Sequence, residues 1–223
     1  QPTVGRHIAA LEQALGLVLF TRSQQGLLPT EAALALRPYA QAMGHTAAAL
    51  VRAADSHGGG VRGTVRVTAS EVIGVEVLPP IISQLRQQHP HLKVELVLTN
   101  RLSDLLQLEA DIAVRMLRPR QEQLLAQRVG LIEVGLHARD DYLQQHGVPV
   151  HMHDLAHHSV IGFDQENAFI RSLAIQGFER SAFALSSDSD LAQLALIRAG
   201  AGIGGCQVQL AKRDPRLQRV LPD

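Results

Sequence analysis

The chain has 223 residues, of which 46% are hydrophobic and 19% are charged, and its formal net charge is zero. This length allows two small domains or one large one, and the composition is typical of a globular protein and excludes a disordered one. Zero net charge excludes nucleic-acid binding through an overall basic excess, so any such contact needs a local patch. The single cysteine, Cys206, excludes an internal disulfide framework and favours a cytoplasmic protein. No apolar run reaches the roughly 20 residues of a membrane span, and no signal peptide opens the chain, so we expect no membrane contact.

Residues 1–29 are expected to form a short helix followed by a hairpin. Pro2 suits a first helical turn, where its missing N–H has no intrahelical partner, and Gly16 is a natural stop. Apolar residues recur between them at helical spacing, namely Val4, Ile8, Leu11 and Leu15. Two extended runs joined by a polar tip follow, over residues 17–20 and 21–28.

Residues 30–60 are expected to form a long linker helix and a hinge. Thr30 opens the helix, and apolar or small residues then alternate in steps of four and three, at Leu36, Ala40, Met43, Ala47, Leu50 and Ala54. Pro38 either kinks the helix or marks its true start. The stripe fits a helix packed on its own domain or one that pairs with a second copy, and we favour dimerisation. The sequence His57-Gly58-Gly59-Gly60 is a flexible joint.

Residues 61–223 alternate strand and helix patterns, which predicts an α/β domain with a largely parallel sheet. Strands are expected at 64–69, 93–98, 111–114, 131–137, 159–163 and 183–187, and helices at 78–85, 103–108 and 191–199. The pattern restarts after Gly147 and Pro149. We therefore expect two lobes, lobe I over about 61–148 and lobe II over about 149–223.

The segment from Gln1 to Glu12 (QPTVGRHIAALE) resembles the recognition helix of LysR-type transcriptional regulators. The resemblance continues through residues 15–22 (LGLVLFTR) and 28–32 (LPTEA), and more loosely over the rest of the chain. It implies a winged helix-turn-helix whose first helices precede Gln1, a linker helix, and a two-lobed effector domain similar to periplasmic binding proteins, with the C-terminal part missing. Gly5 replaces a serine of the family that can reach DNA, and Ala33 replaces the usual glycine.

The resemblance identifies double-stranded DNA as a partner. Polar and cationic side chains near a helix N-terminus can enter the major groove, so we expect DNA contacts from Gln1, Thr3, Arg6 and His7. Arg22, in the wing, is better placed for the phosphate backbone.

A small-molecule effector is expected in the crevice beyond the carboxyl ends of the strands. The residues at the carboxyl ends of these strands, or directly after them, are Ser70, Thr99, Asn100, Arg115, Phe163, Asp164, Ser187 and Asp188. Exposed helix N-termini after Ser70 and Asn100 favour a carboxylate. Glu71 and Asp164 favour an amine or a polyol instead. Alternatively, Ser70, Ser103 and Asp188 only cap helices.

Other motifs indicate neither a metal, a cofactor nor catalysis. The histidines at 151, 153, 157 and 158 lack a cysteine that would complete a zinc site. The glycines between Gly200 and Gly205 follow a helix, unlike a dinucleotide loop, and predict a tight turn. Cys206 has no evident base partner, and no catalytic pair stands in a supporting motif.

We therefore predict a ligand-responsive DNA-binding regulator that forms a homodimer through residues 30–57 and, as the resemblance implies, a homotetramer. The main alternative is a solute-binding protein of a transport system, which would carry a secretion signal and lack the segment 1–20. A small α/β enzyme is a third possibility, and it would need a catalytic pair.

Overall fold

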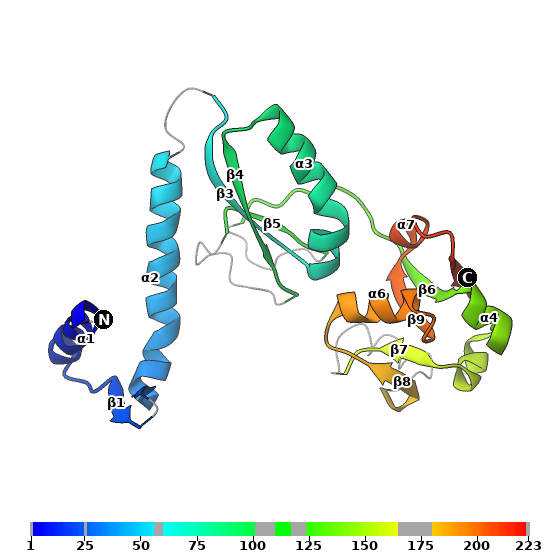
Figure 1. The fold of residues 1–223 in the computed structure, drawn as a ribbon, viewed down its shortest axis with the longest axis horizontal. Helices are drawn as coiled ribbons and strands as arrows, with labels where there is room; N and C mark the ends of the chain where they lie inside the picture. The colour runs from blue at the N-terminus through cyan, green and yellow to red at the C-terminus, as the bar shows by residue number, and fades with distance from the viewer. Residues whose placement is uncertain are drawn as a thin grey trace. The chain divides into compact units, whose positions relative to one another are not determined.

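The computed structural model describes residues 2–24, 26–55, 60–100, 110–116, 124–164 and 180–221 (Figure 1). The chain divides into two compact units. The first unit consists of Gln1–Val67, Gln88–Glu95 and Leu102–Ala113, and the second of Thr68–Gln87, Leu96–Arg101 and Val114–Asp223. No described helix has both the length and the apolar character needed to cross a membrane.

Helix α1 spans Pro2–Leu15 and ends at Gly16, as predicted, because the φ of +65° at Gly16 is a left-handed conformation that glycine adopts at little cost. The hairpin pairs β1 (Phe20–Ser23) with β2 (Gly26–Pro29) in antiparallel register. β1 begins at Phe20, whereas the first extended run was predicted over residues 17–20. The Glu12 carboxylate accepts hydrogen bonds from the N–H groups of Leu19 (2.7 Å) and Phe20 (3.0 Å), which holds this turn against α1.

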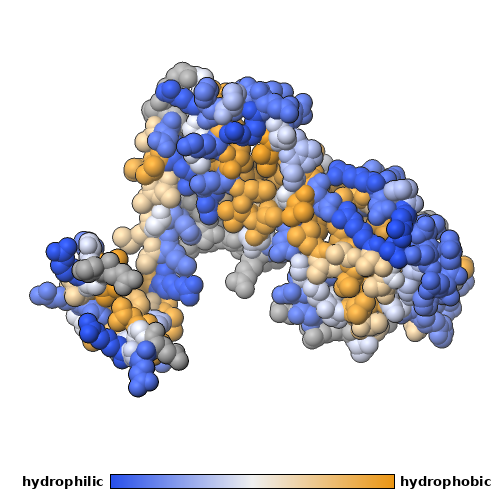
Figure 2. Space-filling model, viewed as in Figure 1, coloured by the Kyte–Doolittle hydropathy of each residue, from blue (hydrophilic) through white to orange (hydrophobic). Residues whose placement is uncertain are grey.

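Helix α2 spans Glu31–Asp55. Thr30 caps it, because its Oγ1 accepts a hydrogen bond from the N–H of Ala33 at 3.3 Å. Pro38 lies inside the helix and so does not mark its start. Tyr39, Met43 and Leu50 are each about seven-tenths exposed, and Figure 2 shows pale orange residues along much of α2. Residues 57–59 of the predicted hinge lie outside the described residues.

The last turn of α2 carries an arginine that is bound by an aspartate. Arg52 is only 9% exposed and donates from Nε (2.9 Å) and Nη2 (3.0 Å) to the Asp111 carboxylate. The backbone N–H of Arg66 donates to the same carboxylate at 2.8 Å, and the Arg66 side chain pairs with Glu95 at 2.8 Å. The three hydrogen bonds to Asp111 join α2 to the strand that carries Arg66.

The first sheet has the strand order β4-β3-β5, with bounds close to those predicted: β3 is Gly63–Ala69, β4 is Leu92–Leu98 and β5 is Ile112–Val114. A π-helix, η1 (Ile73–Val77), runs into helix α3 (Leu78–Gln88) between β3 and β4. The predicted helical face over 78–85 did not reveal the wider π turn. The helix expected near residues 103–108 lies outside the described residues.

The second sheet has the order β10-β6-β9-β7-β8. Its strands are β6 (Val134–Arg139), β7 (Val160–Gly162), β8 (Phe183–Ser186), β9 (Ile203–Gln207) and β10 (Leu217–Val220). Its helices are α4 (Asp140–His146), η3 (Met152–His157), η4 (Arg180–Ala182), α6 (Asp190–Arg198) and α7 (Val208–Ala211).

The prediction of a largely parallel sheet is wrong for this second sheet. β7 runs parallel to β8 and β9, whereas β6 pairs antiparallel with both β9 and β10. β6 lies in the range 61–148 that we assigned to lobe I, yet it hydrogen-bonds to the strands assigned to lobe II. The sheet is mixed because it contains both parallel and antiparallel pairs. Its first strand in the sequence, β6, comes before the predicted restart at Gly147.

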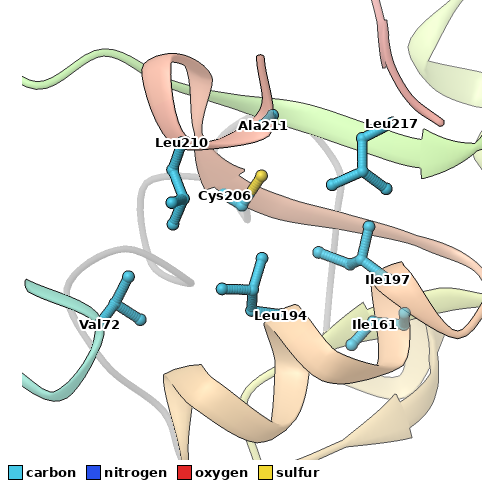
Figure 3. Close-up of a cluster of buried hydrophobic side chains, with 8 residues drawn as sticks. All are labelled: Val72, Ile161, Leu194, Ile197, Cys206, Leu210, Ala211 and Leu217. Atoms are coloured by element: carbon cyan, nitrogen blue, oxygen red, sulfur yellow. The ribbon is translucent and has the colours of Figure 1, made fainter. Parts of the chain in front are cut away.

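Two hydrophobic clusters form the core of the second unit. The first, drawn in Figure 3, consists of Val72, Ile161, Leu194, Ile197, Cys206, Leu210, Ala211 and Leu217. The second consists of Ala138, Tyr142, Leu143, Leu155, Val160, Ile203 and Val220. Val72 comes from the turn that leads into η1, so the first cluster packs that turn against α6, β9 and α7.

The glycines after α6 form the tight turn that the sequence predicted. Gly200 has a φ of +77°, and a Cβ added to Gly202 would lie 2.1 Å from the backbone oxygen of Ser159. The glycines thus let the chain pass close to Ser159 and enter β9 at Ile203, where the backbone N–H bonds to that same oxygen at 2.9 Å.

Candidate functional site

Helix α1 exposes three of the residues that we predicted to contact DNA. Thr3, Arg6 and His7 are exposed on α1, and Arg22 is exposed on β1. Gln1 lies outside the described residues. No ion pair holds Arg6 or Arg22 within the part of the chain that the structure describes, so both guanidinium groups are available to phosphate or base edges.

A cavity of about 380 Å³ lies within the second unit. Its lining is mainly apolar and comes from the turn after β3, the strands β6, β7, β8 and β9, and helices η3 and α6. The lining residues are Ser70, Val72, Met116, Val134, Leu136, Met152, Leu155, Val160, Ile161, Gly162, Phe163, Phe183, Asp190, Gln193, Leu194, Gly205, Cys206 and Gln207. Val72, Leu194 and Cys206 can be followed in Figure 3. Apolar walls with a few polar groups are typical of sites for small organic molecules.

The polar groups of the lining come mainly from Ser70 and the first turns of α6. The Ser70 Oγ is buried without a hydrogen-bond partner among the described residues. Gln193 is 5% exposed, and its Nε2 donates to the Ser187 carbonyl at 2.8 Å. Since a buried polar atom without a partner costs free energy, the Ser70 hydroxyl is a candidate to bind a ligand.

Asn100 connects the turn before η1 to the start of α6. Its Oδ1 accepts a hydrogen bond from the Glu71 N–H at 3.1 Å, and its side chain also hydrogen-bonds Asp190. Ser189 Oγ donates to the Glu71 carboxylate at 3.0 Å. Burial raises the pKa of Asp190, and the nearby charge of Glu71 raises it further, while the hydrogen bond from Asn100 acts in the opposite direction.

The other predicted effector residues are placed differently. Phe163 lines the cavity, whereas Thr99, Asn100, Arg115, Asp164 and Asp188 are not in its lining. Arg115 donates to Thr68 Oγ1 at 2.8 Å, and burial lowers its pKa. One carboxylate oxygen of Asp164 is buried without a partner among the described residues, and Asp188 is exposed.

The alternative that Ser70 and Asp188 only cap helices is wrong for both residues. Ser189 caps α6, because its Oγ accepts from the N–H of Ala192, so Asp188 is not the cap. The amide of Glu71 is bound by Asn100, and the Ser70 side chain makes no such bond. Ser103 lies outside the described residues. Sequence reasoning missed Asp190 and Gln193, although the Ser-Asp-Ser-Asp run at 187–190 marked the start of a helix.

The histidine and cysteine motifs form no reactive centre in the described part of the chain. The rings of His151 and His153 stack, and no cluster there could hold a metal ion. Cys206 Sγ lies 3.4 Å from His137 Nδ1, but that nitrogen lies 2.9 Å from the Gly135 carbonyl, which can only accept a hydrogen bond. Nδ1 therefore carries a proton and is no base for the thiol, and burial raises the pKa of Cys206 to about 11.

Two family models match the chain. The model of the LysR substrate binding domain matches residues 58–223, and that of the bacterial regulatory helix-turn-helix protein, lysR family, matches residues 1–34. An HTH-type transcriptional regulator of Xanthomonas campestris pv. campestris is 26% identical over 159 residues, which cover 71% of this chain and 46% of that protein. The Mau operon transcriptional activator of Paracoccus denitrificans is 30% identical over 136 residues, 61% of this chain and 48% of that protein. The chain spans about half the length of most of these curated relatives.

Solved structures show the same fold. CbnR in complex with its target DNA matches all of this chain and 80% of that chain, with a TM-score of 0.70 and 21% identity. CrgA from Neisseria meningitidis matches 99% of this chain and 77% of that chain, with a TM-score of 0.65 and 21% identity. These matches confirm the predicted fold class, a helix-turn-helix segment and linker helix followed by an α/β effector domain.

Proposed function

This chain belongs to the LysR family, and from that premise we propose that it is a cytoplasmic DNA-binding transcriptional regulator that responds to a small organic effector. The observation that carries the proposal is that α1, which falls in the matched helix-turn-helix region, presents Arg6 and His7 to solvent with no ion pair at Arg6 among the described residues. The match over residues 1–34 favours a regulator over a solute-binding protein of transport, since a transport protein has no need of such a segment.

In this proposal Thr3 and Arg6 reach base edges, and Arg22 contacts phosphate. Gln1 and His7, which flank Thr3 and Arg6 in the sequence, make further contacts to DNA. Effector binding takes place at the cavity, with Ser70 and Phe163 from the predicted set and Asp190 and Gln193 from α6. Asn100 acts indirectly, because it holds Glu71 and Asp190. We assign residues 1–29 to the DNA-binding part, 30–60 to the linker and 61–223 to the effector domain.

Self-association is proposed to take place through α2. A contiguous exposed apolar stripe on a helix is a common interaction surface, and Tyr39, Met43 and Leu50 provide one. A dimer formed through this stripe would present two copies of α1 to a two-fold symmetric site on DNA.

The test is DNA binding by Arg6→Ala, measured by fluorescence anisotropy on duplexes selected from genomic DNA by the wild-type chain. A lost base contact costs about 1–3 kcal/mol, so affinity should fall roughly tenfold to a hundredfold. Lys212→Ala is the matched control, because it removes an exposed cation from the second unit. Equal affinities of the Arg6 variant and the wild-type chain would contradict the proposed role of α1.

A further inference from the structure

The described lining of the cavity in the second unit contains an acidic side chain and no basic one. Among its described lining residues only Asp190 and Cys206 are ionisable, and the Cys206 thiol is neutral near pH 7, since its pKa is about 11. No lysine, arginine or histidine belongs to that lining. Among the described residues of the lining, the only charge that can face a ligand is therefore negative.

The charged groups that the structure describes next to the lining do not add a free positive charge. Glu71 lies close enough to Asp190 for its charge to act on it, which adds a second carboxylate beside the first. Arg198, near Cys206, is bound by both carboxylate oxygens of Glu76 at 2.5 and 3.1 Å. Arg115 is outside the lining and donates to Thr68. Among the described residues, a carboxylate ligand would thus meet acidic groups and no free guanidinium in the lining.

The polar atoms of the lining are suited to accept hydrogen bonds. The Gln193 side-chain amide already donates to the Ser187 carbonyl, which leaves its carbonyl oxygen as an acceptor. The Asp190 carboxylate accepts one hydrogen bond from Asn100 and has further lone pairs. The buried Ser70 Oγ has no partner among the described residues and can accept as well. A group with several N–H donors, such as a protonated amine, complements these three side chains.

We propose that the effector is a small organic cation, a protonated amine carried on an apolar or aromatic body, with Asp190 as its charge partner. The proposal rests on the proposed function of the cavity as the effector site. The apolar body packs against Phe163, Phe183 and Leu194, and the ammonium group lies at the first turn of α6. This differs from the carboxylate that the helix N-termini alone would favour, because Asn100 already occupies the Glu71 amide and Glu71 and Asp190 surround the position with negative charge.

The experiment compares three probes of similar shape, 2-phenylethylamine, 2-phenylethanol and phenylacetate, by calorimetric titration into the full chain near pH 7. We expect the amine to bind roughly tenfold more tightly than the alcohol, or better, and phenylacetate to bind more weakly than either, since hydrogen bonds to charged groups are about twice as strong as neutral ones. Asp190→Asn keeps the shape of the side chain and should remove the preference for the amine. Asp188→Asn, the same change two residues away at an exposed position outside the lining, should keep it.

Each result decides the question. Tighter binding of phenylacetate than of the amine, sensitive to Ser70→Ala, would overturn the cation assignment and leave the cavity as the effector site. Equal binding of amine and alcohol in the wild-type chain, or an unchanged preference in Asp190→Asn, would also overturn it. If no probe binds, both the cation assignment and the cavity as effector site fail, whereas the DNA-binding test with Arg6→Ala remains independent of that outcome.

Discussion

Replacing Asp111 by alanine should release the C-terminal end of α2. In the wild-type chain the Asp111 carboxylate accepts two hydrogen bonds from Arg52, at 2.9 and 3.0 Å, and one from the Arg66 N–H, at 2.8 Å. The Arg52 side chain is 10% exposed and that of Asp111 is 34% exposed. Removing one partner of a buried pair costs about 3–5 kcal/mol, whereas exposed pairs contribute about 0–1 kcal/mol. Partial exposure of Asp111 places the expected loss between these limits, at about 2 kcal/mol.

The assay is native-state hydrogen exchange of the amides in residues 45–55, because exchange reports the free energy of local opening. Glu95→Ala is the control, since the Arg66–Glu95 pair is similarly short but its side chains are 34% and 49% exposed. It should cost less than about 1 kcal/mol. A loss in Asp111→Ala no greater than in Glu95→Ala would refute the reasoning that burial of Arg52 makes its partner important.

The stability that Asp111→Ala loses should also depend on pH. Burial alone would raise the pKa of Asp111, but the hydrogen bonds from Arg52 and the Arg66 N–H, with the charges of both arginines, hold it below its ordinary value. A lowered pKa means that the contribution is fully present above the unfolded pKa of about 3.9 and is lost as the pH falls through the folded pKa. The difference between wild type and Asp111→Ala should therefore be constant near neutral pH and shrink below about pH 4.

Asp190→Asn should raise the unfolding temperature near neutral pH but not below about pH 4, because the raised pKa of Asp190 means that its ionised form is disfavoured in the folded chain. Glu76→Gln should lower stability by about 1–2 kcal/mol in urea unfolding, because it leaves Arg198, 35% exposed, without its charge partner. Gly202→Ala should lower the free energy of unfolding by at least about 2 kcal/mol, since the added Cβ would meet the Ser159 oxygen. Gly44→Ala, in α2 with open space around it, should instead raise the free energy of unfolding by about 1 kcal/mol or less.

Local chemistry explains which elements the sequence could predict. The C-terminal end of α1 and the start of α2 depend on Gly16 and Thr30, which act within a few residues of their own position. The pairing of β6 with β10 joins residues 136–139 to residues 217–220, and no local pattern indicates it. The apolar run at 131–137 also moved the expected strand toward its N-terminal side, although Leu131 is 85% exposed and β6 continues to Arg139.

The candidate effector site was predictable only in part, for a similar reason. Ser70 and Phe163 line the cavity, and both were candidates because they stand at the carboxyl ends of predicted strands, which is where ligands bind in α/β sheets. Asp190 was missed because an acidic residue in the first turn of a helix is favoured by the helix dipole and needs no functional explanation. The role that we propose for Asp190 depends on Glu71, more than a hundred residues earlier, and only the fold brings the two carboxylates together.

Strand β3 joins the proposed effector site, along a short stretch of chain, to a residue that shares hydrogen bonds with α2. The Arg66 N–H on β3 donates to Asp111, which holds Arg52, and the strand ends at Ala69, directly before Ser70 in the cavity lining. A strand rises about 3.3 Å per residue, so Arg66 and Ser70 are separated by about 13 Å of extended chain. A ligand shifts an equilibrium only by binding one arrangement better than another. If Ser70 moves with the ligand, the hydrogen bonds to Asp111 carry a displacement of β3 to α2, so exchange in residues 45–55 should respond to ligand in the wild-type chain and not in Asp111→Ala.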